Sequence, residues 1–160
     1  MNNTTTEHLK ELTDSIKAGE RVVLLPPGIF SLVAVVILLI IASVALVGSL
    51  ISIFAGGEAP SFKAGIRFSS MLVIFIFVIF PGLMIFQGKK SLSLWMFFYA
   101  SVVLIASSFL IIINMSHFLN YNFSNTPLLF SLIFSLSSLY VMRTGSFHTL
   151  KEFFYLLKKK

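Results

Sequence analysis

The chain contains no cysteine, which excludes disulfide bonds, thiolate nucleophiles and zinc sites built on thiolates. Charged residues are also scarce: they make up 11% of the 160 residues, whereas about a quarter of an ordinary soluble domain is charged. Hydrophobic residues reach 57%, more than a small soluble domain can bury, because its surface is large relative to its volume. Lipid removes that difficulty, and the composition therefore predicts an integral membrane protein.

Three long stretches of the sequence, 22–57, 68–88 and 91–142, carry no Asp, Glu, Lys or Arg. The third is divided by a linker at 116–126 that is rich in Asn and aromatic residues. A helix of about 20 apolar residues crosses the roughly 30 Å of hydrocarbon in a bilayer, and the apolar runs lack the alternation of a membrane β-barrel. We therefore predict an all-α integral membrane protein with four transmembrane helices in a compact bundle. Within a transmembrane domain at 28–142, the predicted spans cover 29–54, 68–86, 92–115 and 127–142.

Prolines help to place the ends of these spans. Pro26 and Pro27 precede the first span, where proline is tolerated because the first helical turn needs no backbone N–H donor. Pro81 lies near the end of the second span and is expected to kink the helix or to unwind its last turn. Pro127 opens the fourth span, which is short. That span either thins the bilayer locally or continues to Arg143, whose long side chain would then reach the headgroups.

Lysine and arginine are distributed unevenly between the two sides of this arrangement. One side has only Lys63 and Arg67, in the loop between the first two spans. The other side has the remaining ten, which are Lys10, Lys17, Arg21, Lys89, Lys90, Arg143, Lys151, Lys158, Lys159 and Lys160. Because basic residues near spans remain in the cytoplasm, we predict that both termini are cytoplasmic. Frequent Phe, Ile, Ser, Asn and Lys suggest an AT-rich bacterial gene, so the predicted location is the bacterial inner (plasma) membrane.

The two tails, residues 1–27 and 143–160, are too short to form domains, and each is predicted to hold an amphipathic cytoplasmic helix. Their apolar faces consist of Leu9, Leu12 and Ile16 in the first tail, and Phe147, Leu150, Phe154 and Leu157 in the second. A basic helix of this kind tends to lie in the headgroup plane. From the net charge of +6 we expect contact with anionic lipid headgroups and no nucleic acid binding. The predicted membrane-surface contacts are Trp95, Lys89, Lys90, Arg143, Phe154, Lys158, Lys159 and Lys160.

The predicted spans contain no Asp, Glu, Lys, Arg or His. Such residues usually mark proton relays, ion paths and voltage sensors, so their absence argues against those functions. Asn114, the only amide in a span, lies at the end of the third, where water can satisfy it. Outside the spans, Glu58 with His117 and His148 with Glu152 are the pairs considered for acid–base or metal chemistry. Neither pair has a third partner, and we predict no enzyme activity, no cofactor and no metal.

Small residues recur about one helical turn apart on two of the spans. They are Ala45, Gly48, Ser49 and Ser52 on the first span and Ser131, Ser135 and Ser138 on the fourth. Small residues at such spacing let membrane helices approach closely. The simplest interpretation is helix packing within the chain. The alternatives are an interface with another protein, or a weakly polar path in an oligomer.

The sequence contains no motif that is specific to a protein family. The leading hypothesis is a non-catalytic membrane protein that associates laterally with another membrane protein, as an accessory, anchoring or immunity-type subunit. Self-association into a channel or transporter, with the serines of the fourth span facing the axis, is the alternative. A membrane enzyme acting on lipid or isoprenoid is the third hypothesis.

Overall fold

The computed structural model of the chain describes residues 3–20, 22–23, 25–55, 57–113 and 126–158, and the regular structure within these ranges is entirely helical. The helices are α1 (Asn3–Lys17), α2 (Ile29–Phe54), α3 (Pro60–Ile74), α4 (Phe80–Phe86), α5 (Ser93–Ile113), α7 (Thr126–Arg143) and α8 (Gly145–Lys158). A π-helical segment, η1 (Phe75–Ile79), joins α3 to α4, and a 3-10 turn, η2 (Lys90–Leu92), precedes α5. The segments long and apolar enough to cross a membrane are Ile29–Phe54, Pro60–Phe86, Lys90–Ile113 and Thr126–Arg143. The predicted all-helical fold with four such helices is therefore confirmed.

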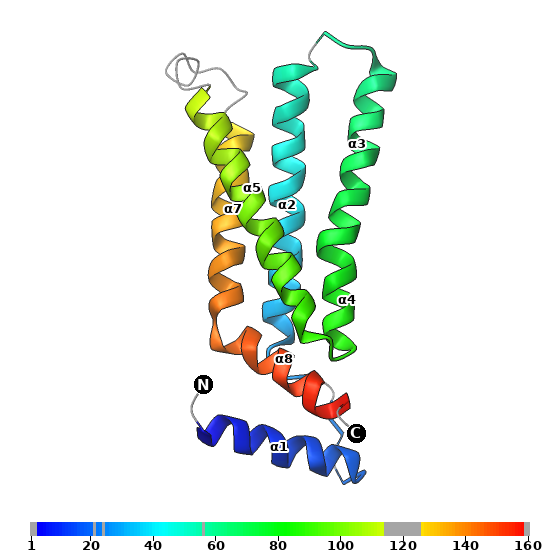
Figure 1. The fold of residues 1–160 in the computed structure, drawn as a ribbon, viewed down its shortest axis with the longest axis vertical. Coiled ribbons are helices and arrows are strands. Elements are labelled where there is room, and N and C mark those ends of the chain that lie inside the picture. The colour runs from blue at the N-terminus through cyan, green and yellow to red at the C-terminus, as the bar shows by residue number, and fades with distance from the viewer. Residues whose placement is uncertain (1–2, 21, 24, 56, 114–125, 159–160) are drawn as a thin grey trace.

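The four long segments run side by side, and both chain termini lie at the same end of them (Figure 1). α7 packs along α2 and α5, whereas α8 packs across the ends of several helices and against α1. Figure 1 shows α8 crossing below the long segments and α1 lying below α8. We call this end, with α1, α8 and the turn at 87–90, the basic end. The opposite end, with the turn at 57–59, is called the loop end.

The helical bounds differ from the predicted spans mainly at the start of the second. α2 covers the same residues as the first predicted span, but α3 begins at Pro60 rather than at residue 68. Ala59 has an extended backbone with ψ 148°, and Pro60 supplies the fixed φ that suits a first helical turn. Lys63 and Arg67 therefore lie on the helix. From Arg67 to Phe86 the helix is about 30 Å long, which places Arg67 at the boundary of the hydrocarbon.

Pro81 is accommodated by a wide turn in the helix before it. Proline lacks an N–H group, and its ring clashes with the carbonyl four residues earlier. In η1 the backbone instead follows a π-helical path, and the N–H of Phe80 donates to the carbonyl of Phe75, five residues back. The helix thus continues through Pro81 to Phe86 without unwinding its last turn.

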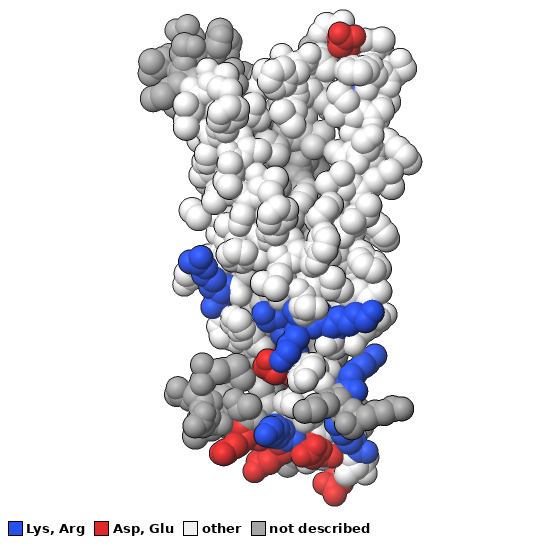
Figure 2. Space-filling view, in the orientation of Figure 1, with Lys and Arg blue, Asp and Glu red and all other residues white. Residues whose placement is uncertain are grey.

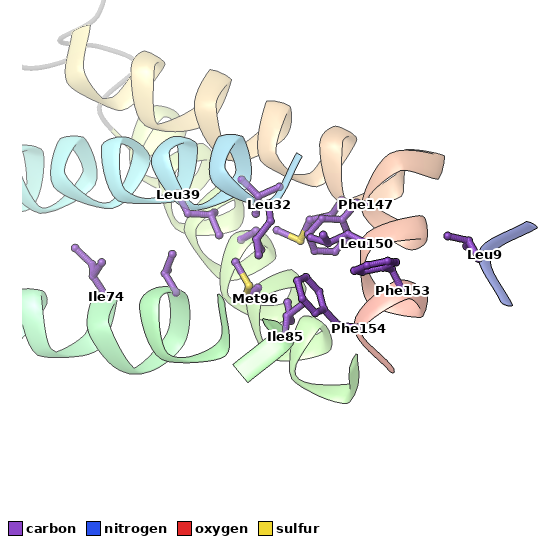
Figure 3. Close-up of a cluster of buried hydrophobic side chains, with 14 residues drawn as sticks. Leu9, Leu32, Leu39, Ile74, Ile85, Met96, Phe147, Leu150, Phe153 and Phe154 are labelled. Atoms are coloured by element: carbon purple, nitrogen blue, oxygen red, sulfur yellow. The ribbon is translucent and has the colours of Figure 1, made fainter. Parts of the chain in front are cut away.

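The larger buried cluster lies at the basic end (Figure 3). Its labelled members from α1, α2, α4, α5 and α8 are Leu9, Leu32, Leu39, Ile85, Met96, Phe147, Leu150, Phe153 and Phe154. Phe147 and Leu150 are 1% and 0% exposed. Burying a side chain of this size contributes about 1.5–3 kcal/mol relative to water, so docking of α8 is a main source of stability at this end.

The apolar face of α8 is covered by protein rather than by lipid headgroups, which corrects one prediction. Phe154, assigned from the sequence to the membrane surface, is 8% exposed and meets Phe86 edge-on with 5.2 Å between the ring centroids. An amphipathic helix has the same residue pattern whether its apolar face covers lipid or protein. The pattern alone could not distinguish the two.

α1 forms the outermost layer of the basic end. Leu9 is 5% exposed and belongs to the same buried cluster as the aromatic residues of α8. Glu7, Glu11 and Asp14 are exposed, and acidic side chains lie at the extreme end of the molecule over α1 (Figure 2). The acidic side chains of α1 therefore lie beyond the basic residues of the turn at 87–90 and of α8, together with the exposed Lys10 and Lys17 of α1 itself.

Two glycines with positive φ allow α8 to dock. Gly28, just before α2, has φ 80°, and a Cβ at this position would overlap the carbonyl oxygen of Ser146. Gly88, after α4, has φ 79°, and a Cβ there would lie 3.0 Å from the carbonyl oxygen of Phe154. Both positions need a left-handed backbone and close approach to α8, and glycine provides both.

Candidate functional site

The serine stripe of α7 lies inside the protein. Ser131, Ser135 and Ser138 are each 0% exposed, and α7 packs against α2 and α5. Ser131 Oγ lies 2.7 Å from Ser107 Oγ of α5, so a buried hydrogen bond links the two helices. Ser135 and Ser138 donate to carbonyl oxygens of their own helix. None of the three hydroxyls faces outward, so this stripe offers no polar surface to the axis of an oligomer.

The small residues of α2 do not act as one set. Ser49 is 1% exposed and Ala45 is half-buried, so this pair faces the interior. Gly48 and Ser52 are exposed, and a Cβ on Gly48 would meet nothing within 4 Å. Only the first pair therefore takes part in packing within the chain.

A second link between helices was not predicted. Ser43 Oγ of α2 donates to the carbonyl of Leu39 at 2.7 Å and also lies 2.8 Å from Tyr99 Oη of α5. Because a serine hydroxyl has one proton, Tyr99 is the donor to Ser43. The Tyr99 ring stacks on Phe77 of the second membrane-crossing segment with 5.6 Å between the centroids.

The residues considered for catalysis are not brought together in the described part of the chain. Glu58 is exposed, while His117 and Asn114 lie outside the described residues. His148 is exposed, and Glu152 accepts a hydrogen bond from Lys90 Nζ at 2.9 Å, so these two do not form a metal-binding pair. Among the described residues, no group of three His, Asp or Glu side chains is close enough to hold a metal ion.

An open groove of about 840 Å³ separates α2 from α3 near the loop end. We call it the outer groove; it is lined by Val47, Leu50, Ser61, Phe62, Gly65, Ile66, Ser69, Ser70 and Val73. Ser61, Gly65 and Ser69 repeat every four residues and are exposed. This spacing could have been found in the sequence. It was missed because Arg67 was taken as the boundary of the span, which left two of the three residues in a predicted loop.

Basic side chains gather over the basic end, below a wide surface without charged residues (Figure 2). Lys89, Arg143 and Lys158 are exposed there, whereas Lys159 and Lys160 lie outside the described residues. Lys90 is held by the ion pair with Glu152 and lies 3.9 Å from the centroid of the Tyr155 ring. Trp95 is 53% exposed at the start of α5.

A cleft of about 210 Å³ opens at the basic end, where α5, α7 and α8 meet. We call it the basic cleft; its lining residues are Ser93, Leu94, Phe97, Met142, Arg143, Phe147, His148 and Lys151. Lys151 Nζ donates to Ser93 Oγ at 3.2 Å and lies 5.2 Å from the centroid of the Phe147 ring. The Arg143 guanidinium carbon lies 5.8 Å from the centroid of the Phe97 ring. Aromatic rings thus hold both cations at the rim of the cleft.

Partial burial lowers the pKa of two cleft residues. Burial lowers the pKa of Lys151, while the Glu152 carboxylate opposes this shift and the Lys90 ammonium adds to it. Burial also lowers the pKa of His148 from 6.5, and the positive charge of Lys151 lowers it further against the effect of Glu152. His148 is therefore neutral at pH 7, and the positive charge of the cleft comes from Arg143 and Lys151.

No protein-family model, curated protein or solved structure matches this chain. The four helices able to cross a membrane indicate a multi-pass membrane protein. The outer groove and the basic cleft are the two surface features that bear on function.

Proposed function

We propose that the chain is a non-catalytic protein of the bacterial inner membrane that acts by lateral association with another membrane protein, as an accessory, anchoring or immunity-type subunit. Its four spans form a compact bundle with both termini in the cytoplasm. The amphipathic helices α1 and α8 lie at the cytoplasmic face of this bundle. The outer groove receives a transmembrane helix of the partner.

The proposed orientation is supported by the basic end. Basic residues beside membrane spans are retained in the cytoplasm, and Lys89, Lys90, Arg143 and Lys158 all lie at the end that holds both termini. The loop end has Lys63 and Arg67 on the first turns of α3. The outer groove then opens in the half of the protein that is farther from the cytoplasm.

The outer groove is the observation that carries the proposal of a partner helix. Helices in lipid associate through close backbone contact, which small residues four apart permit. Ser61, Gly65 and Ser69 give α3 such a surface, and a Cβ at Gly65 would meet nothing within 4 Å. The adjoining Phe68 and Met71 are each 66% exposed, so apolar contact area is available beside the small residues.

A crosslink from the groove tests this association. Because the chain has no cysteine, Ser69→Cys carries a photoactivated crosslinker at one position only. In the membrane of the native host we expect one discrete adduct that contains a second membrane protein. Gly65→Trp fills the groove, and it should lower the yield of this adduct at least about fivefold, as expected from a loss of about 1 kcal/mol.

Two matched variants control for crosslinking to random neighbours. Ile105→Cys places the crosslinker at an exposed position of α5, outside the groove, and should give no discrete adduct. Ile105→Trp adds bulk at the same exposed position, which does not line the groove, and should leave the Ser69→Cys adduct unchanged. An adduct with the mass of two 17.8 kDa chains would show that the helix in the groove belongs to a second copy of this chain. No adduct, or equal adducts from both cysteines, would contradict the proposal.

A further inference from the structure

The basic cleft carries a net positive charge, because the cations of Arg143 and Lys151 are not neutralised by nearby carboxylates. Among the described residues, no carboxylate lies within salt-bridge distance of Arg143 or Lys151. The nearest acidic residue on α8, Glu152, is already paired with Lys90 at 2.9 Å. Lys151 is half-buried, and a cation partly removed from water is stabilised by an anion that comes within hydrogen-bond distance.

Two further lining residues of the cleft also suit an anion. Ser93 and His148 both line it. Ser93 Oγ donates to the Lys90 carbonyl at 2.8 Å and accepts from Lys151, which fixes the Lys151 ammonium at the cleft. Neutral His148 can donate one further N–H to an oxygen anion. At about 210 Å³ the cleft is smaller than the roughly 300–1,000 Å³ of pockets for drug-sized ligands, so it suits a headgroup.

An apolar groove leads from the cleft along α5 and α7. This groove, about 690 Å³ in volume, is lined by Leu104, Leu136, Ser137, Leu139, Tyr140, Val141 and Arg143. Arg143 lines both the groove and the cleft. From Arg143 to Leu136 the groove extends about 10 Å along α7, away from the basic end. The basic cleft and the apolar groove thus meet at Arg143, at the end of a segment able to cross a membrane.

We propose that the basic cleft binds the phosphate headgroup of one anionic phospholipid, whose acyl chain lies in the groove between α5 and α7. Arg143 and Lys151 bind the phosphate oxygens, and His148 donates to the headgroup. Basic pockets between membrane helices commonly hold anionic lipid headgroups. This site is on different helices from the outer groove, so it does not depend on the proposed partner.

Native mass spectrometry of the full chain in mild detergent tests this site. Dioleoyl-phosphatidylglycerol is added in steps, and phosphatidylcholine with the same acyl chains serves as the zwitterionic comparison. We expect one tightly held phosphatidylglycerol and weaker phosphatidylcholine binding. Arg143→Gln and Lys151→Gln should each weaken phosphatidylglycerol binding about fivefold to tenfold, whereas Lys151→Arg should preserve it. Lys89→Gln removes one exposed charge from the same end but outside the cleft, and should change the affinity less than about twofold.

Each remaining outcome of this titration opposes the proposal. Equal weakening by Lys89→Gln and Lys151→Gln would mean general attraction to surface charge. Equal binding of both lipids would mean that the net negative charge of the headgroup is not recognised. Displacement of phosphatidylglycerol by millimolar inorganic phosphate would assign the cleft to a soluble anion. The melting temperature of each variant in lipid-free detergent shows whether it is folded. If Lys151→Gln does not fold, Arg143→Gln and Lys151→Arg still test the site.

Discussion

Replacing Gly28 with alanine is expected to destabilise the protein by more than about 3 kcal/mol. Gly28 has φ 80°, which costs a residue with a Cβ about 1–2 kcal/mol. The new methyl group would also overlap the backbone carbonyl of Ser146 in α8, which cannot rotate away as a flexible side chain could. α8 would have to shift, and the packing of Phe147 and Leu150 in the buried cluster at the basic end would be lost in part.

Gly19→Ala is the matched control for this substitution. Gly19 has φ 77°, close to that of Gly28, but a Cβ at this position would meet nothing within 4 Å. It isolates the cost of the left-handed backbone. The measurement is the fluorescence of the single tryptophan, Trp95, during heating in detergent. At about 3 °C for each kcal/mol, we expect Gly19→Ala to lower the melting temperature by about 3–6 °C and Gly28→Ala by about 9 °C or more. Equal decreases would show that α8 does not lie against Gly28.

The double substitution Ser135→Leu with Ser138→Leu is the second change with a large expected effect. Both serines are 0% exposed on the side of α7 that packs within the protein. Inserting extra methylene groups into a packed interior costs about 1–3 kcal/mol per site, so the pair should cost about 2–6 kcal/mol. In the same heating experiment we expect the melting temperature to fall by about 6 °C or more.

Ser137→Leu makes the same chemical change on the same helix and serves as the control. Ser137 lines the open groove between α5 and α7, where a longer side chain has room. Its effect should stay within about 0.5 kcal/mol. If the double variant were as stable as Ser137→Leu, the serine stripe would not lie in a packed interior, and a face toward another chain would again be a valid interpretation.

The membrane-crossing helices were predictable because a long uncharged run has few stable alternatives. The start of α2 at Ile29 follows Pro26 and Pro27, as the sequence predicted. The start of α3 did not follow, because Arg67 was treated as the boundary of a span although a helix can continue into the headgroup region. That choice hid Ser61 and Gly65, two of the three small residues of the outer groove.

Pairings between distant segments were the part that the sequence could not supply. The spacing of Ser131, Ser135 and Ser138 predicted one face of a helix, but not that α2 and α5 cover it. In the same way, the apolar pattern of α8 did not reveal that Phe154 packs on Phe86. The basic cleft joins Ser93, Arg143 and Lys151 from three helices, and no local pattern connects residues so far apart in sequence.

Labelling of single cysteines decides whether the four helices cross the membrane with the basic end in the cytoplasm. Glu58→Cys at the loop end and Gln87→Cys at the basic end are exposed positions in a chain with no other cysteine. In intact spheroplasts, a membrane-impermeant maleimide should label Glu58→Cys, and it should label Gln87→Cys only after the membrane is permeabilised. Labelling of Gln87→Cys in intact spheroplasts would contradict the proposed orientation, and labelling of both cysteines there would contradict the membrane-crossing arrangement.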